Sequence, residues 1–170
     1  MTGIVLVGLP GSGKSKLGRI LAPELGLAFI DLDAYIEQSS GQTIAQLFER
    51  GESHFRDVET RALRDCLEKP DTLIATGGGI VEREQNRELL QDAVTVFLDI
   101  EVEDALGRVA GKTHRPLLAG DARAKLDALA QRRRPLYMEV ADVTVSVSNL
   151  PAPENAQRVL DAIRTRVPKA

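Results

Sequence analysis

The sequence predicts an α/β fold: a three-layer α/β/α sandwich with a five-stranded parallel sheet. Two observations support this prediction. Five short apolar segments are separated by longer segments in which apolar residues recur at helical spacing, which is typical of a parallel sheet with helices on both faces. The first apolar segment, residues 4–7, leads into a glycine-rich loop and then a helical pattern, the order found around a phosphate-binding loop. All 170 residues are expected to form a single domain.

Each expected strand is short and apolar. The first is uninterrupted, as in a buried parallel strand, whereas the last alternates between apolar and hydroxyl side chains. The expected strands are residues 4–7, 27–30, 72–76, 94–100 and 143–147.

The expected helices lie between and after these strands. They are residues 14–25, 34–50 with a break at Gly41, 54–69, 103–109, 122–134 and 156–167. Thr43 is a suitable N-cap for the helix after the break. Pro23 should kink the first helix near residues 19–22 or make its last turn irregular, and of the two we expect the kink. Pro135 should end the helix that starts at residue 122. Residues 149–153 are expected to form a proline-marked loop.

Composition excludes several classes of function. Hydrophobic residues make up 43% of the chain, which argues against global disorder, and the net charge of −3 argues against nucleic-acid binding as the main function. Cys66 is the only cysteine, so no internal disulfide can form, and no apolar run reaches the length of a membrane span. The first strand begins at once and leaves no room for a signal peptide. We therefore expect a cytoplasmic protein without membrane or nucleic-acid partners.

A phosphate-binding loop follows the first strand. It is the segment Gly8-Leu9-Pro10-Gly11-Ser12-Gly13-Lys14-Ser15, which fits the pattern G-x-x-x-x-G-K-[ST]. Its glycines let the backbone curl around phosphates, whose charge suits a row of N–H groups at the start of a helix. Lys14 can reach the β- and γ-phosphates, and the Ser15 hydroxyl can ligate Mg²⁺. The sequence therefore predicts a site for a nucleoside triphosphate.

Two aspartates follow the second expected strand, at the end where ligands of parallel sheets collect. Asp31 and Asp33 would share a side if the chain stays extended there. One of them can hold the Mg²⁺ shell while the other accepts the proton of an acceptor hydroxyl or orients it. Asp99 is a second Mg²⁺ candidate, but it also suits a helix cap or a solvated position, and Asp31 is better placed. The remaining possible metal ligands lack metal-ligand spacing and are interpreted as structural: His54, Cys66 and His114.

Glycines and arginines indicate how an acceptor is held. The triplet Gly77-Gly78-Gly79 would let a ligand lie against the backbone. An acceptor carboxylate would call for bidentate arginine, and Arg56 is a candidate, although it could instead pair internally with Glu59. Further arginines stand out at Arg108, Arg115 and Arg132-Arg133-Arg134. Residues 111–120 have a glycine at each end and a basic middle, as a mobile flap would.

Together these features resemble the shikimate kinase family. The resemblance spans nearly the whole chain and rests on an ordered set of motifs: Gly8 to Ser15, Asp31-x-Asp33, Phe55-Arg56, Gly77-Gly78-Gly79, Arg115-Pro116-Leu117 and Arg133. The glycine triplet and the Arg-Pro-Leu segment are weak signals alone, but their order and intervals are specific. The choice of Arg133 over Arg132 and Arg134 depends on alignment to the Pro-Leu-Tyr segment that follows, so all three stay candidates.

The resemblance implies a P-loop kinase fold of the nucleoside-monophosphate-kinase branch, with sheet order 2-3-1-4-5 and a mobile lid. It implies transfer of the γ-phosphoryl group of ATP to the 3-hydroxyl of shikimate, with Mg²⁺, in the aromatic amino-acid (chorismate) pathway. ATP and shikimate are the implied partners, and we expect a monomer. Residues 32–60 would form the acceptor-binding segment, and residues 110–124 the lid.

The resemblance also implies residue roles. Asp33 would bind the shikimate hydroxyls and act as base, with Lys14 and Arg115 as further catalytic residues, while Ser15 and Asp31 would hold Mg²⁺. The ATP site would comprise Gly11, Ser12, Gly13, Lys14, Ser15, Lys16, Arg108, Arg115 and Pro153. The shikimate site would comprise Asp33, Phe48, Phe55, Arg56, Gly77, Gly78, Gly79, Pro116, Leu117 and Arg133. Within it, the two arginines and a backbone group of Gly78 or Gly79 would hold the carboxylate.

Two alternatives stay open from the sequence. Another small-molecule kinase of the same branch, such as a gluconate or nucleoside-monophosphate kinase, would share the phosphate loop but gives no reason for Asp33, Arg56, Gly79 and Arg133 together. An ATP-binding module without catalysis would bind ATP and release no acceptor-dependent ADP. The N-K-x-D run of GTP-specific proteins is not present.

Overall fold

A five-stranded parallel sheet forms the centre of the molecule, in a computed structural model that describes residues 3–109 and 121–166. The order across the sheet is β2-β3-β1-β4-β5. The strands are β1 (Ile4–Val7), β2 (Ala28–Asp31), β3 (Thr72–Ala75), β4 (Val94–Ile100) and β5 (Val143–Val147). All four pairings are parallel, with Val5 opposite Ile74 on one side of β1 and opposite Thr95 on the other. The predicted class and the order 2-3-1-4-5 are confirmed.

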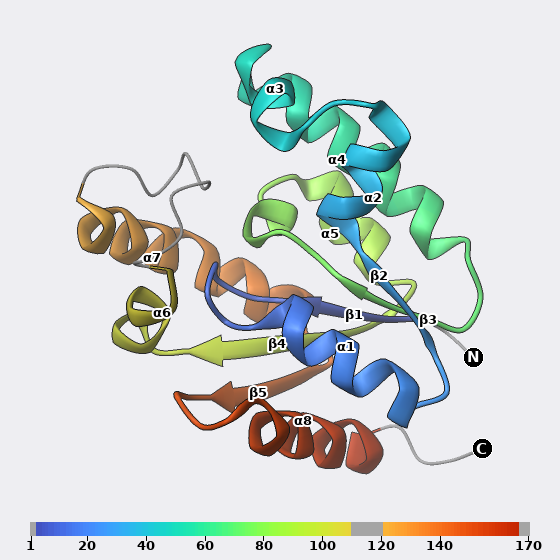
Figure 1. The fold of residues 1–170 in the computed structure, drawn as a ribbon, viewed down its shortest axis with the longest axis vertical. Helices are drawn as coiled ribbons and strands as arrows, with labels where there is room; N and C mark the ends of the chain where they lie inside the picture. Colours follow the sequence, from blue (N-terminus) through green and yellow to red (C-terminus); the bar gives the residue numbers. More distant parts are fainter. Residues whose placement is uncertain (1–2, 110–120, 167–170) are drawn as a thin grey trace.

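Helices cover both faces of the sheet (Figure 1). They are α1 (Lys14–Glu24), α2 (Leu32–Ser40), α3 (Ile44–Glu49), α4 (Glu52–Leu67), α5 (Glu84–Leu90), α6 (Val102–Val109), α7 (Ala122–Val140) and α8 (Ala152–Arg166), with a short 3₁₀ helix η1 (Gly78–Val81). Helices α1 and α8 pack together on one face, and α5 and α7 lie on the other beside η1. Helices α2, α3 and α4 pack on one another next to the β2 edge, at the top of Figure 1.

The core lies on both faces of the central strands. Every residue of β1 and β3 is buried, whereas the edge strand β5 alternates between buried and exposed residues. This is the pattern expected when helices cover both faces of a parallel sheet. Because parallel strands end at the same edge, the segments that follow β1, β2 and β3 meet there, and this edge carries the candidate site.

Some local predictions hold and others do not. Thr43 caps α3 with a complete capping box, as predicted, since its side chain accepts from the Gln46 N–H and the Gln46 side chain accepts from the Thr43 N–H. For Pro23, the alternative to the expected kink is observed, an irregular last turn of α1: the Leu25 N–H is shared between the carbonyls of Leu21 and Ala22. No element was predicted for residues 77–93, where η1 and α5 lie.

The prediction that Pro135 ends a helix is wrong. Helix α7 continues through Pro135 to Val140. An interior proline costs a helix about 3 kcal/mol, so the next turn must be held by contacts elsewhere. Tyr137 supplies them, because its ring is fully buried against Phe97, with centroids 5.0 Å apart, and its hydroxyl donates to the Gly78 carbonyl at 2.6 Å.

The predicted loop at residues 149–153 is also shorter than expected. Helix α8 begins at Ala152, so Pro153 lies in its first turn. Proline is well tolerated there, because the N–H groups of the first turn have no partner within the helix. The loop between β5 and α8 is therefore residues 148–151.

Candidate active site

The phosphate-binding loop connects β1 to α1 as predicted. Gly11 and Gly13 have φ angles of 84° and 86°, a left-handed conformation that favours glycine. Gly13 is the N-cap of α1 and has no side chain to occupy the helix start. The first N–H groups of α1 therefore remain directed at the cavity side of the loop, as in an anion-binding helix N-terminus.

Lys14 lies folded over this loop. Its ammonium group donates to the carbonyls of Gly8 at 2.8 Å and Leu9 at 3.0 Å, and to the Ser12 hydroxyl at 3.3 Å. The side chain is buried, so these contacts keep the charge satisfied inside the loop. The lysine is thus positioned at the place where phosphates would lie against the loop.

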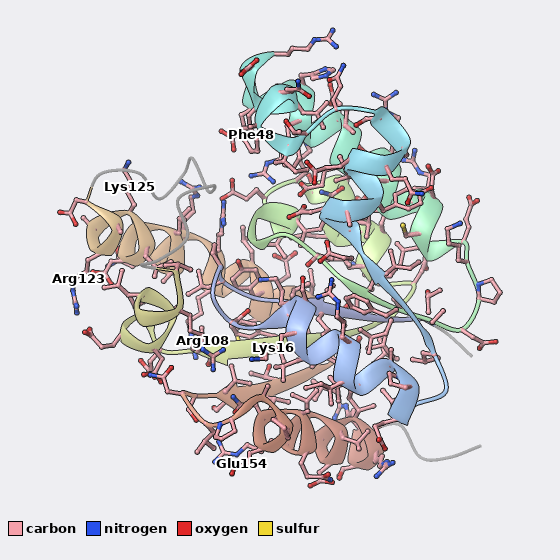
Figure 2. All side chains as sticks on the ribbon, in the orientation of Figure 1. Lys16, Phe48, Arg108, Arg123, Lys125 and Glu154 are labelled. Carbon is pink, nitrogen blue, oxygen red and sulfur yellow. The ribbon has the colours of Figure 1, made fainter. Side chains whose placement is uncertain are left out.

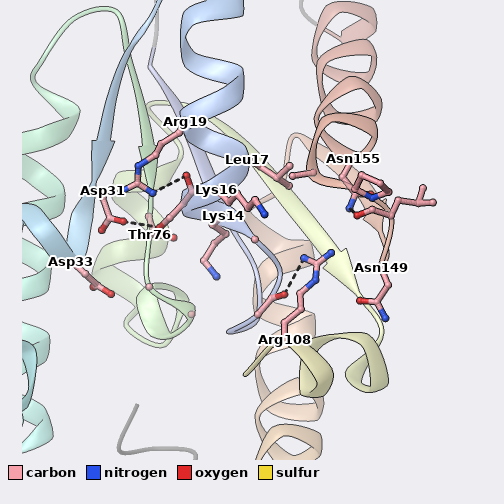
Figure 3. Close-up of a pocket in the computed structure, with 18 residues that line it drawn as sticks. Lys14, Lys16, Leu17, Arg19, Asp31, Asp33, Thr76, Arg108, Asn149 and Asn155 are labelled. Atoms are coloured by element: carbon pink, nitrogen blue, oxygen red, sulfur yellow. Dashed lines mark hydrogen bonds between the residues drawn. The ribbon is translucent and has the colours of Figure 1, made fainter. Parts of the chain in front are cut away.

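A cavity of about 660 Å³ opens in front of the loop. Figure 3 shows Asp31 and Asp33 on one wall, Arg108, Asn149 and Asn155 on the other, and Lys14 between them. Its lining comprises Gly11, Gly13, Lys14, Ser15, Lys16, Leu17, Arg19, Asp31, Asp33, Thr76, Gly77, Gly78, Arg108, Asn149, Leu150, Pro151, Ala152 and Asn155. The cavity therefore joins the phosphate loop to the start of the glycine triplet.

The two aspartates reach the cavity by a different route from the one predicted. The chain does not stay extended after β2, because Asp31 is the N-cap of α2 and Asp33 is in its first turn. One Asp31 oxygen accepts from the Ala34 N–H at 3.1 Å, which is why the helix starts so early. Both carboxylates still line the cavity.

Ser15 and Asp31 form the part of the site that suits a divalent cation. The Ser15 hydroxyl donates to the second Asp31 oxygen at 2.7 Å, so two oxygen ligands lie side by side on the cavity wall. Mg²⁺ prefers such hard oxygen ligands and usually takes only one or two from the protein, with the rest from water and phosphate. Within residues 3–109 and 121–166, no group of three or more His, Cys, Asp or Glu residues could hold a metal ion.

The glycine triplet adjoins four charged side chains. A Cβ on Gly77 would lie 3.5 Å from both the Asp33 and the Glu59 carboxylates, which is ordinary contact. A Cβ on Gly78 would lie 2.9 Å from Pro10 Cδ and 3.1 Å from an Arg133 nitrogen, and one on Gly79 would overlap the guanidinium group of Arg56. Close approaches therefore account for the glycines at positions 78 and 79.

Arg56 is buried and paired. It donates to Glu59 at 2.9 Å and to Glu52 at 3.3 Å, so the predicted ion pair with Glu59 is present. Burial acts to lower the pKa of Arg56, but the charges and hydrogen bonds of Glu59 and Glu52 outweigh it and raise the pKa. Burial raises the pKa of Glu59, helped by the nearby Asp33 carboxylate and opposed by Arg56. Arg56 thus stays a cation while it faces Gly79.

The structure distinguishes the three consecutive arginines of α7. The side chain of Arg133 is only 2% exposed and donates from Nε to Glu82 at 3.2 Å. Those of Arg132 and Arg134 are 59% and 57% exposed. Arg134 pairs with Asp99 at 2.6 Å, so Asp99 is the partly exposed member of an ion pair at the end of β4. Arg133 is the arginine that lies next to the glycine triplet.

Aromatic residues pack beside Arg56. The rings of Phe48 and Phe55 stack with centroids 4.3 Å apart, and the Arg56 guanidinium lies 5.2 Å from the Phe55 ring centroid. Figure 2 shows Phe48 on α3, in the upper part of the molecule and away from Lys16 and Arg108. Phe48 and Phe55 together form an apolar surface on the α3–α4 side of Arg56.

The cavity wall opposite Asp31 and Asp33 suits a nucleoside. Arg108 donates to the carbonyls of Gly11 at 3.3 Å and Ser148 at 2.5 Å, so it ties α6 to the phosphate loop and to the loop after β5. Lys16 and Arg108 line the same cavity (Figures 2 and 3). Pro153, predicted as a nucleotide contact, is not among the lining residues, whereas Pro151 and Ala152 before it are.

Several predicted residues cannot be placed. Arg115, Pro116, Leu117 and His114 lie outside the described residues, as does most of the predicted lid at residues 110–124. Of the other residues predicted as structural, Cys66 is fully buried, and burial raises its thiol pKa to about 11. His54 is partly buried in the first turn of α4.

Sequence reasoning missed the residues that position other parts of the site through hydrogen bonds. They are Glu82, Tyr137 and Asn155, and Glu59 appeared only as a possible partner of Arg56. Asn155 is 1% exposed and donates from its side chain to the Ser148 carbonyl at 2.8 Å, which fixes the loop on the nucleoside wall. Tyr137, two residues after Pro135, could have been suspected only from its place in the Pro-Leu-Tyr segment. The others carry no local signal.

No helix in the described ranges is long and apolar enough to cross a membrane.

Comparison with known proteins gives a consistent result. The family model described as shikimate kinase matches residues 10–164. A shikimate kinase of Gloeobacter violaceus is 45% identical over 167 residues, covering 96% of this chain and 93% of the relative, and one of a Marinomonas species is 44% identical, covering 95% and 91%. A solved shikimate kinase of Acinetobacter baumannii, in complex with shikimate, is 38% identical with a TM-score of 0.95, covering 99% and 96%.

A more distant structure has the same fold. A gluconokinase of Sinorhizobium meliloti has a TM-score of 0.61 at 19% identity, covering 96% of this chain and 91% of its own. At that identity the likeness extends to the fold alone.

Proposed function

The chain belongs to the shikimate kinase family, and from that premise we propose how its residues transfer the γ-phosphoryl group of ATP to the 3-hydroxyl of shikimate. The product is shikimate 3-phosphate, in the aromatic amino-acid pathway. One observation carries the assignment of residues: a triphosphate loop and a pair of buried arginines lie at the same edge of the sheet, joined by the glycine triplet.

ATP would occupy the half of the cavity formed by the phosphate loop. The N–H groups at the start of α1 would bind the phosphates, with Ser12, Ser15 and Lys16 around them. The Lys14 ammonium would exchange the loop carbonyls of Gly8 and Leu9 for β- and γ-phosphate oxygens. Arg108 and residues 149–152 would flank the adenine, with Pro153 behind them.

Shikimate would occupy the half formed by the glycine triplet. Its carboxylate would bind between the guanidinium groups of Arg56 and Arg133, against the backbone of Gly78 and Gly79. Phe48 and Phe55 would form an apolar wall, and Asp33 would bind the ring hydroxyls. Arg115, Pro116 and Leu117 would complete the site from the lid; these three roles stay predictions based on the family resemblance.

In the transfer, the 3-hydroxyl oxygen attacks the γ-phosphorus and the bond from that phosphorus to the β–γ bridging oxygen breaks. Asp33 accepts the hydroxyl proton, and ADP leaves with the bridging oxygen. Lys14, and Arg115 from the lid, neutralise the charge on the transferring group. Positioning and charge neutralisation therefore provide most of the catalysis.

Mg²⁺ is the metal we propose for this reaction. Ser15 and Asp31 would hold it, directly or through water, and bound there it would neutralise phosphate charge. We further propose that the enzyme is a monomer and acts in the cytoplasm. Sedimentation at catalytic concentration measures the oligomeric state, and a dimer would contradict this.

The acceptor can be identified directly. Mg²⁺-dependent ADP release is measured with shikimate, gluconate and AMP offered separately, and we expect turnover with shikimate alone. Equal turnover with gluconate or AMP, or none with shikimate, would contradict the proposal.

Two arginines of α7 supply matched variants for the site itself. Arg133→Ala should raise the KM for shikimate about 100-fold through loss of charge-assisted hydrogen bonds. Arg134→Ala, whose side chain is exposed and pairs with Asp99, should leave that KM within about twofold. If the two variants behaved alike, Arg133 would have no special role at the acceptor.

A further inference from the structure

Glu82 connects η1 to α7 next to the proposed acceptor site. It follows η1 directly, and its backbone N–H donates to the Gly79 carbonyl at 3.1 Å. Its side chain turns to α7, where one carboxylate oxygen accepts from Arg133 Nε at 3.2 Å and from Arg132 Nε at 2.7 Å. One residue thus contacts both the glycine triplet and the buried arginine that faces it.

We propose that Glu82 is a positioning residue for the acceptor carboxylate, acting through the hydrogen bond to Arg133 Nε. This inference rests on the proposed role of Arg133. A guanidinium group has one Nε–H and two terminal nitrogens, so an acceptor at Nε fixes the plane of the group. With Nε held by Glu82, a terminal nitrogen of Arg133 lies beside Gly78, where the acceptor carboxylate is proposed to bind.

Arg132 explains why the Glu82 carboxylate does not cancel the positive charge next to the proposed acceptor site. Glu82 is shared between a buried arginine and an exposed one, so the three groups together keep one positive charge. Burial acts to raise the pKa of Glu82, but the hydrogen bonds and charges of Arg132 and Arg133 outweigh it and lower the pKa. Glu82 therefore stays a carboxylate at neutral pH and a steady acceptor for Arg133.

The test compares three substitutions of Glu82 in the full-length enzyme by steady-state kinetics. Glu82→Ala and Glu82→Met remove the acceptor and should raise the KM for shikimate about tenfold, with kcat and the KM for ATP within about twofold. Glu82→Gln keeps an oxygen acceptor at the same place and should stay within about threefold of the wild type. A similar loss in Glu82→Gln and Glu82→Ala would overturn the hydrogen-bond role.

The controls separate this inference from the proposed function. Glu139→Ala removes a carboxylate of α7 that pairs with Arg87 of α5, and it should leave all constants unchanged. Adding Glu82→Ala to Arg133→Ala should raise the KM for shikimate no further. If Arg133→Ala alone has no effect, the assigned carboxylate site is wrong; if it has a large effect and Glu82→Ala has none, only the role of Glu82 is wrong. If Glu82→Ala does not fold, Glu82→Met, which fills the same space, decides the outcome.

Discussion

Replacing Gly79 by alanine tests the acceptor site at its closest contact. Gly79 does not have a positive φ, so its backbone conformation accepts a side chain. The added Cβ would lie 2.6 Å from Arg56 Cζ and closer still to its two terminal nitrogens, whereas ordinary contact begins at 3.4 Å, so the guanidinium group must move by at least about 0.8 Å. A shift of that size is enough to disrupt the 2.9 Å hydrogen bond to Glu59.

The expected effect falls mainly on shikimate. Displacing Arg56 removes at least one charge-assisted contact to the carboxylate, so the KM for shikimate should rise about 10- to 100-fold while the KM for ATP stays unchanged. The free energy of unfolding should fall by about 1–3 kcal/mol because a buried group is pushed from its place. Steady-state kinetics and urea denaturation measure the two quantities.

Gly107→Ala is the matched control. It is also a glycine without a positive φ, in α6, and a Cβ there would meet nothing within 4 Å. It should leave both KM values unchanged and should not destabilise the fold, since alanine is the better helix former. If Gly79→Ala behaved like this control, Arg56 could leave its position at no cost, and its role as a fixed carboxylate ligand would be refuted.

Three further predictions concern other parts of the site. Asp33→Asn should lower kcat at least about 100-fold with ATP binding preserved, measured by single-turnover kinetics and calorimetry; near-normal turnover would remove Asp33 as the base. Tyr137→Phe should lower the free energy of unfolding by about 1–2 kcal/mol in urea titrations, because the half-buried Gly78 carbonyl loses its donor; no change would mean that the carbonyl finds another partner. Cys66 has a folded pKa of about 11 against an ordinary value of 9.0, so stability should fall as pH rises from 9 to 11, where only the unfolded thiol ionises; Cys66→Ala should reduce that slope, and an equal slope would exclude the thiol as its source.

The fold could be predicted largely because parallel strands are buried on both faces. Such strands appear in the sequence as short apolar runs, and the observed boundaries of β1, β4 and β5 equal the predicted ones. The order of the strands, in contrast, came from the family resemblance, because apolar runs do not reveal which strand is next to which.

The errors in the fold have tertiary causes. Pro135 is an ordinary helix breaker locally, but Tyr137 is anchored to Phe97 and Gly78, far away in sequence. Asp31 looked like the end of an extended segment, yet its carboxylate caps a helix that begins at once. In each case a side chain found a partner that local patterns do not specify.

In the site, too, local sequence patterns specify some residues, whereas others depend on tertiary contacts. Residues whose chemistry is written into a motif, such as Lys14 and Ser15, could be predicted from the sequence alone. Glu82 and Asn155 have no motif, since each acts by accepting or donating a hydrogen bond to a group brought near by folding. Likewise, three arginines in a row are equivalent in sequence, and only packing buries the middle one.

The proposed acceptor half-site is assembled from four separate segments, around Asp33, Arg56, Gly79 and Arg133, which are close together only in the folded chain. An unfolded chain therefore offers shikimate no comparable binding surface, and ligand binding is coupled to the folding equilibrium by mass action. A ligand present at one hundred times its dissociation constant adds about 2.7 kcal/mol to stability when it binds only the native state. Shikimate thus acts as a thermodynamic reporter of intact tertiary structure, independent of whether ATP is present or any phosphoryl group is transferred.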